Sequence, residues 1–232
     1  MAFTKSALRF FRNLKRNNNK SWFEANRYVY ENDVRAPMKD LIEEIDVRLA
    51  RLAPEMCGDI RRSMFRINRD IRFSKDKSPY KTNAGCWFFH RGSSGKVGGE
   101  AREGSAGFYF HLEPGQCFVG GGLWMPPRPQ LNRIRMTIAE KPADFARVAR
   151  SVQRYGGLDD EAMLKRMPRG YADDHPAAKW LRYQSFTSGR TLTDAQVTSA
   201  KLPSILARDF AGLLPLVRWI NQTVGYRPAT SR

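Results

Sequence analysis

The chain has 232 residues, which is enough to bury a sizeable core in one large domain or two small ones. Forty Lys and Arg against 23 Asp and Glu give a formal net charge of +17, which attracts polyanions such as nucleic acid, anionic membrane surfaces or phosphorylated metabolites. No run approaches 18 apolar residues, and early Lys and Arg interrupt any signal-peptide core, so a membrane span and secretion are not expected.

Cysteine usage bears on the compartment. Cys57, Cys86 and Cys117 are odd in number and widely spaced, and no CxxC pair occurs. This usage is typical of reduced thiols in a cytosolic protein. We therefore expect a cytoplasmic location.

The N-terminal part has a helical pattern. Thr4 can cap a first helix, and the Asn17 to Asn19 run can end it and cap the next. Pro37 suits the first turn of a longer helix, because its apolar residues repeat at three and four up to Leu52.

The stretch from Arg61 to Asn83, here called the cationic stretch, has eight Lys or Arg and two carboxylates. From 64 to 74, apolar residues fall on odd positions and polar ones on even positions, which predicts a strand over Met64 to Phe73 with one buried face. Arg69 breaks this pattern, so either the strand bends there or the guanidinium is buried with a partner. Pro79 then constrains a turn.

Two interpretations of this stretch stay open. Lysines and short turns protect exposed sheet edges from pairing with other chains, so it can be a solvated edge strand. Alternatively it forms one concave anion site, since Arg offers bidentate donors for phosphate or carboxylate. The candidate ligand-binding residues are Arg66, Arg69, Arg72, Lys75, Lys77, Tyr80 and Lys81, with Trp124 as a further aromatic surface.

A sheet is predicted next, with strands over Ala84 to His90, Gly107 to Leu112 and Gln116 to Leu123. Pro114-Gly115 makes the last two a hairpin. If Glu113 is opposite Gln116, then His111/Phe118 and Tyr109/Gly120 share one face, and Phe110/Val119 and Phe108/Gly121 share the other. The Gly120 to Gly122 run indicates a close approach to the backbone, by a ligand or by the ring of Trp124 or Tyr109.

The Gly- and Ser-rich segment from Arg91 to Ser105 is predicted to be a mobile loop. It lacks the GxxxxGK[ST] pattern, so it is not expected to be a phosphate-binding loop.

The C-terminal part again predicts helices. We expect them over Arg128 to Glu140, Pro142 to about Tyr155, Asp159 to Met167, Pro176 to Leu181, after a Thr193 to Gln196 capping box, and from near Pro203 with a bend at Pro215. A strand is expected over Tyr183 to Ser188, and Tyr226 to Arg232 should fray.

No complete catalytic motif is present. The three histidines are scattered and no Cys/His cluster exists, so neither a metal nor a cofactor is expected. Weak candidates for proton transfer are Asp70, Tyr80 and His111. Cations beside Asp70 would lower its pKa and make it a poor base. His111 stands out because it shares a predicted hairpin face with Tyr109.

Several motifs together carry a family resemblance. They are RDIRFSKDKSPYKTN, NNNKSWFEANRYVY, GFYFHLEPG, GGGLWMPP and HPAAKWLRYQSF. With these motifs the chain resembles the bacterial and fungal family called domain of unknown function 2461 (DUF2461), over roughly Phe3 to Val224. The resemblance implies no activity and no catalytic residues.

These observations predict one α+β domain over 1–225 with a frayed tail over 226–232. Its mainly antiparallel sheet should be flanked by N- and C-terminal helices. We expect the protein to bind an anion, either a phosphorylated ligand or nucleic acid, and nucleic acid without sequence preference. The alternative is an enzyme on an anionic or phosphorylated small substrate, with Arg and Lys orienting it and Tyr, Asp or His transferring protons.

Overall fold

The sheet at the centre of the molecule is antiparallel throughout, in the order β1-β2-β3-β4-β5. The computed structural model describes residues 3–72, 75–93 and 104–229. The strands are β1 (Met56–Cys57), β2 (Ala84–His90), β3 (Gly107–Leu112), β4 (Phe118–Leu123) and β5 (Phe186–Thr191). β1 to β4 come from residues 56–123, and β5 joins the sheet beside β4 after a helical segment, so that strands and helices form one α+β domain.

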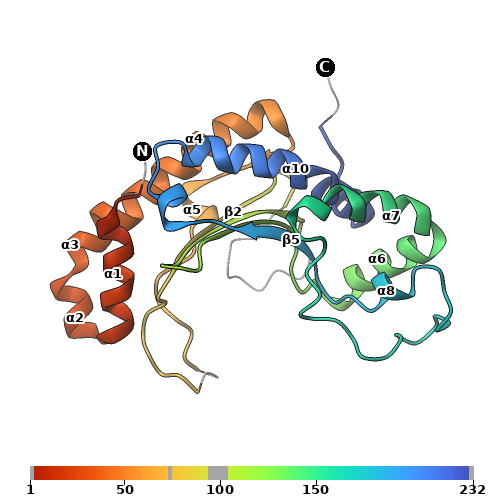
Figure 1. Ribbon diagram of the computed structural model, residues 1–232, viewed down its shortest axis with the longest axis horizontal. Coiled ribbons are helices and arrows are strands. Elements are labelled where there is room, and N and C mark those ends of the chain that lie inside the picture. Colours follow the sequence, from red (N-terminus) through yellow and green to blue (C-terminus); the bar gives the residue numbers. More distant parts are fainter. Residues whose placement is uncertain (1–2, 73–74, 94–103, 230–232) are drawn as a thin grey trace.

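Helices cover one face of this sheet and form a lobe at each side. They are α1 (Lys5–Arg16), α2 (Lys20–Ala25), α3 (Arg27–Val29), the π-helical η1 (Tyr30–Arg35), α4 (Ala36–Leu52), α5 (Ile60–Ser63), α6 (Arg128–Glu140), α7 (Pro142–Ser151), the 3₁₀ turn η2 (Gln153–Tyr155), α8 (Ala178–Leu181), α9 (Asp194–Val197) and α10 (Leu202–Thr223). α4 and α10 lie across the sheet, α1 to α3 form one lobe, and α6 to α8 form the other (Figure 1). The molecule is thus arched, with α4 and α10 over the sheet and one helical lobe at each side (Figure 1).

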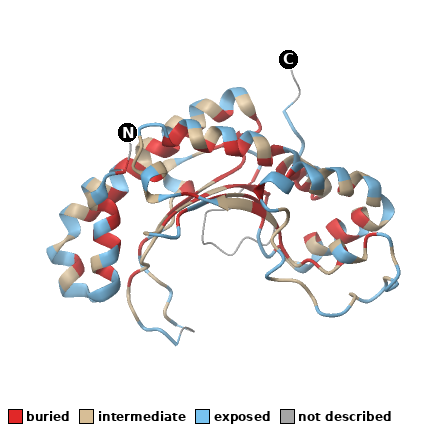
Figure 2. Ribbon diagram, viewed as in Figure 1, coloured by how far each residue is buried: buried red, intermediate tan, exposed pale blue. Residues whose placement is uncertain are grey.

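The core lies between the sheet and the α4–α10 layer, where buried residues concentrate (Figure 2). Phe108 and Phe110 point to this layer, and Phe210 of α10 stacks on Phe108 with ring centroids 4.6 Å apart. Gly121 explains the close approach of α10, since a Cβ there would lie 3.1 Å from the Phe108 ring and 3.2 Å from Leu213 Cβ. The middle glycine of the run is therefore needed for helix packing.

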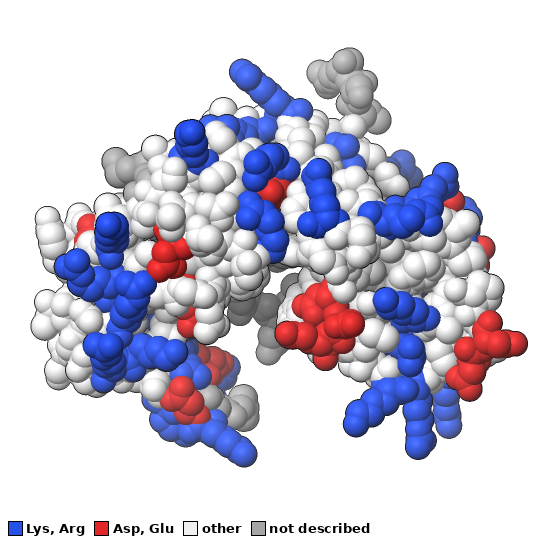
Figure 3. All heavy atoms as spheres, in the orientation of Figure 1, with Lys and Arg blue, Asp and Glu red and all other residues white. Residues whose placement is uncertain are grey.

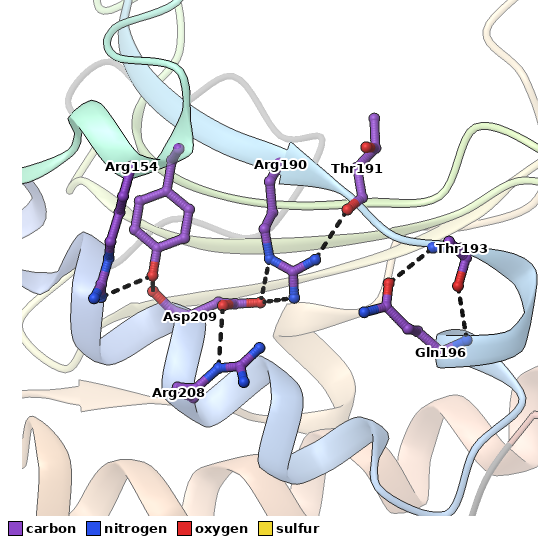
Figure 4. Close-up of polar contacts among 8 residues, drawn as sticks. Arg154, Arg190, Thr191, Thr193, Gln196, Arg208 and Asp209 are labelled. Carbon is purple, nitrogen blue, oxygen red and sulfur yellow. Dashed lines mark hydrogen bonds and ion pairs between the residues drawn. The ribbon is translucent and has the colours of Figure 1, made fainter.

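An ion-pair cluster ties β5 to α10 on this covered face (Figure 4). Asp209 is 3% exposed, and its Oδ2 accepts hydrogen bonds from Nε and NH2 of Arg190 at 2.9 and 2.5 Å. The hydroxyl of Tyr155 donates to the Asp209 carbonyl at 3.2 Å, and Arg154 donates to that hydroxyl at 3.0 Å. The buried carboxylate of Asp209 joins β5 to α10, and the backbone carbonyl of the same residue joins η2 to α10.

Most predicted elements are confirmed. Asn19 caps α2 by accepting from the Trp22 amide, Pro37 lies in the first turn of α4, and Thr193 and Gln196 form the expected capping box. The hairpin register also matches, with His111 opposite Phe118 and Tyr109 opposite Gly120.

The predicted strand over Met64 to Phe73 is wrong. Among residues 64–72, which the structure describes, only isolated bridges occur, Met64 with Cys86 and Asn68 with Tyr80. Lys81 N donates to Ile67 O at 2.8 Å, so the stretch pairs mainly with itself as an arm beside the sheet. The alternation arises because this arm buries Ile67 on one side, not because it continues the sheet.

Two further expectations need correction. Residues 159–167 form turns without a helix, and the last strand lies three residues later than the predicted Tyr183 to Ser188. Both errors come from tertiary contacts: Leu164 N donates to Arg182 O at 2.8 Å, which holds this segment as a loop against the chain before β5.

The tail and the Gly-rich loop are described only in part. Tyr226 and Arg227, assigned to a frayed tail, are held instead by His90, whose Nε2 lies 2.7 Å from the Arg227 carbonyl oxygen and whose ring is 5.0 Å from that of Tyr226. Residues 94–103 and 230–232 lie outside the described residues, and so does most of the predicted 91–105 loop.

Candidate functional site

The face of the sheet turned away from α4 and α10, here called the open face, carries the residues that pair across the strands with Tyr109 and His111. Directly paired residues share a face, so the register places these side chains together. One row is Gly85, His111, Phe118 and Thr191, and the next is Trp87, Tyr109, Gly120 and Gly189. In the part of the chain that the structure describes, no helix packs on this face (Figure 1).

Glycines leave part of this face without side chains. Gly120 and Gly189 are paired next to Tyr109, so two adjacent strands have no side chain at that level. Gly85 gives room to the tyrosine, because a Cβ at Gly85 would lie 2.5 Å from the Tyr109 hydroxyl. The sheet backbone is consequently accessible beside an aromatic row, which suits a flat ligand group.

A hydrogen-bonded chain runs along β3 on this face. Tyr109 Oη lies 2.9 Å from Nδ1 of His111, and His111 Nε2 lies 3.1 Å from Oε2 of Glu113. With Glu113 ionised, Nε2–H donates to the carboxylate, and Nδ1 accepts a hydrogen bond from the Tyr109 hydroxyl. Burial raises the pKa of Tyr109, so its hydroxyl stays protonated until a base accepts its proton. The arrangement can relay one proton between Tyr109 and His111.

An aromatic row connects this chain to the cationic stretch. The Phe65 ring lies edge-on to Tyr109 at 5.7 Å, and Tyr109 lies 5.4 Å from Phe118. Phe118 stacks on His111 at 4.7 Å and is 37% exposed. Lys81 Nζ lies 5.4 Å from the Phe65 ring centre. A cation therefore stands at one end of an aromatic surface whose other end is open to solvent.

Lys81 differs from the other cations of the stretch. It is half-buried, and burial first, then the nearby Arg66, lower the pKa of Lys81. A bound anion would offset both effects, because it favours the charged ammonium. Arg66 itself is exposed.

Two predicted arginines are already paired within the stretch. Arg69 forms an ion pair with Asp76, and Arg72 with Asp70 at 2.7 Å. The Arg72 side chain lowers the pKa of Asp70 to about 2, and hydrogen bonds from Ser78, together with Arg69, lower the pKa of Asp76 to about 2. Asp70 is thus a poor base at neutral pH, as the sequence predicts.

The remaining candidates are dispersed. Lys77 Nζ donates to the Ile71 carbonyl at 2.9 Å, and Lys75 is exposed. Tyr80 is only 6% exposed and its ring stacks on Phe23 at 4.1 Å, so it packs in the core instead of lining a surface. Trp124 is 57% exposed beyond the far end of β4 from Phe118. A ligand-binding role for these side chains stays a prediction.

The site residues that the sequence did not single out as candidates are Tyr109, Phe118, Glu113, Phe65 and Gly85. The sequence places Tyr109 and Phe118 only on the same predicted hairpin face as His111. Alternation along a strand was the available signal for Glu113, since Tyr109, His111 and Glu113 are spaced by two. Phe65 and Gly85 join the site through the pairing of Phe65 N with Gly85 O at 3.1 Å, which no local pattern indicates.

The surface around the open face is hollowed and flanked by charge. Figure 3 shows a hollow between the two lobes, with Lys and Arg gathered on both lobes and acidic patches beside them. None of the described helices is long and apolar enough to cross a membrane. Likewise, residues 3–72, 75–93 and 104–229 contain no group of three or more His, Cys, Asp or Glu placed to hold a metal.

The protein is an α+β protein, because helices cover one face of its antiparallel sheet. The opposite face carries the aromatic row and is the candidate ligand-binding surface. The model of the family described as conserved hypothetical protein (DUF2461) matches residues 6–219, and the chain belongs to this family. No curated protein and no solved structure matches it.

Proposed function

We propose that the protein binds a phosphorylated compound with a planar ring on the open face. The observation that carries this proposal is the continuous row from Lys81 over Phe65 and Tyr109 to the exposed Phe118. An aromatic side chain stacks on a planar ring whatever its edge pattern, and a half-buried lysine contacts a phosphate as a point charge.

The glycines and the net charge support the same proposal. Gly120 and Gly189 place no side chain next to Tyr109 on this face of the sheet. The charge of +17 raises the local concentration of anions and speeds their association. Both a free nucleotide and a nucleotide within a single strand have this chemistry.

Adenosine monophosphate, adenosine and inorganic phosphate separate the two contributions. In a calorimetric titration, adenosine monophosphate should bind more tightly than either of its parts. Phe118→Ala should weaken this binding about tenfold or more, since stacking on one base contributes about 1–3 kcal/mol. Lys81→Ala should weaken it too, and should flatten the salt dependence.

Matched controls are Tyr28→Ala, which removes an 80% exposed aromatic from the N-terminal lobe, and Arg9→Gln, which removes an exposed cation of α1. Both should bind like the wild type. Equal weakening by Tyr28→Ala and Phe118→Ala would contradict the proposal. A (dT)10 oligonucleotide that binds much more tightly than the mononucleotide would identify the ligand as a strand.

An enzyme is the second candidate, and the Tyr109–His111–Glu113 chain is the observation that favours it. A tyrosine beside a histidine that is oriented by a carboxylate is suited to general acid–base catalysis. His111→Gln should abolish conversion of anionic metabolites in a cell extract followed by mass spectrometry. Asp70→Asn should leave the conversion intact, because Asp70 is an exposed ion-pair partner. Metabolite profiles identical with and without wild-type protein would exclude this candidate.

A further inference from the structure

A second cavity lies away from the open face, in the lobe of α6 to α8. It has a volume of about 640 Å³, in the range of small-molecule sites. Its lining comes from the loop after α7 and from α8 with the residue following it: Lys165, Arg166, Met167, Pro168, Arg169, Gly170, Tyr171, Asp173, Ala178 and Arg182. None of these residues belongs to the cationic stretch.

Cations outnumber carboxylates in the lining of this cavity. Lys165, Arg166, Arg169 and Arg182 line it together with a single carboxylate, Asp173. Within the described chain none of the four side chains forms a hydrogen bond or an ion pair, in contrast to Arg69 and Arg72. Like charges that line one cavity repel one another, and a bound anion would relieve this repulsion.

A buried arginine adds to this positive field from α6. Arg135 is 7% exposed, its NH2 group donates to the Tyr183 carbonyl at 3.0 Å, and its Nε is buried without a partner in the described structure. Tyr171, which lines the cavity, interacts electrostatically with Arg135. Burial lowers the pKa of Arg135. It also removes the solvent that would screen the charge of the guanidinium.

The loop that carries the cations is fixed at several points. Gln184 Nε2 donates to the Ala162 carbonyl at 2.9 Å, and the Ala177 amide donates to Nδ1 of His175 at 3.0 Å. Met163, Met167 and Tyr171 pack against the hydrophobic core. The cavity is therefore largely formed before any ligand arrives, which reduces the entropy cost of binding.

We propose that this cavity is a second anion site and binds a small multivalent phosphorylated compound. Four cations grouped around about 640 Å³ match a ligand with two or more phosphate groups better than a single phosphate ion. The half-buried Tyr171 and Met167 offer the same ligand a less polar wall. This site does not depend on binding at the open face.

Tripolyphosphate and inorganic phosphate are the probes, and thermal unfolding is the measurement. A ligand that binds only the folded state raises Tm, here by about 5 °C or more at one hundred times Kd. Tripolyphosphate should give this rise, whereas phosphate at equal concentration should give much less. The double variant Arg166→Gln/Arg169→Gln, both at exposed positions, should abolish the rise and the heat of binding in calorimetry.

The control Arg9→Gln/Lys15→Gln removes two exposed cations from α1 in the opposite lobe and should keep the full response (Figure 1). Phe118→Ala should keep it as well, which separates this site from the open face. An equal loss in the α1 variant would show general charge screening and overturn the proposal. A (dT)12 oligonucleotide that competes more strongly than tripolyphosphate, and only with the Arg166/Arg169 pair present, would overturn it in favour of a nucleic-acid partner.

Discussion

Phe210→Ala is expected to lower the free energy of unfolding by about 4 kcal/mol, since truncating a buried phenylalanine costs about 3–5 kcal/mol. Phe210 is fully buried, and its ring centroid lies 4.6 Å from that of Phe108 and 5.5 Å from that of Phe88. The cavity left by its ring would lie between α10 and the covered face. Chemical denaturation at neutral pH measures this change.

The matched control is Phe118→Ala on the opposite face of the same sheet. Phe118 is 37% exposed, so its truncation should cost about 1 kcal/mol or less, as for most surface positions. The pair of variants separates stability from binding: Phe210 stabilises the fold, and Phe118 is available to a ligand. A large loss of stability for Phe118→Ala would mean that the open face is part of the core.

Asp209→Ala is expected to lower the free energy of unfolding by about 3 kcal/mol, because it leaves Arg190 and Arg208 without the buried carboxylate that they pair with. The Asp209 side chain is 4% exposed and that of Arg190 is 25% exposed. Removing the acid also weakens the link of β5 to α10, which positions the edge of the open face. Equilibrium unfolding in urea gives the value.

Asp144→Ala provides the comparison for that change. Asp144 pairs with Arg147 three residues along α7, and both side chains are exposed, so its loss should change stability by about 0.5 kcal/mol or less. Similar effects of the two substitutions would show that the Asp209 cluster does not hold the sheet to the helix.

The hairpin and the outer helices could be predicted because their signals are local. The Pro114-Gly115 turn, with the Gln116 amide donating to the Glu113 carbonyl at 2.9 Å, fixes the whole β3–β4 register. The register then places His111 beside Tyr109 on one face. Half of the candidate site therefore follows from one turn and the two-residue period of a strand.

The cationic stretch could not be predicted in the same way. Alternation over Met64 to Phe73 suits an arm that pairs with itself as well as it suits a sheet strand. The pairing of residues 67–69 with residues 79–81 distinguishes the two, and no local pattern indicates it. Ion pairing was equally hidden, because Arg69 pairs with Asp76, seven residues away, rather than with the adjacent Asp70. Charge counting therefore overestimated the number of cations left for a ligand.

The cavity cations escaped sequence reasoning for the opposite reason. Lys165, Arg166, Arg169 and Arg182 occur in a segment expected to be partly helical, where charges are normally solvated. Long-range contacts, such as those of Leu164 with Arg182 and of Ala162 with Gln184, bring them around one space. That these four side chains form no hydrogen bond or ion pair within the described residues follows from the fold and not from any local pattern.

The central claim is that a ring-bearing phosphate stacks at Phe118 on the open face. The most direct test places 4-fluorophenylalanine at position 118 and follows its fluorine resonance during titration with adenosine monophosphate. The account predicts a saturable shift with the same midpoint as calorimetry, reduced by Lys81→Ala and weak with phosphate alone. A resonance that does not move while calorimetry records binding would place the ligand elsewhere and contradict the claim.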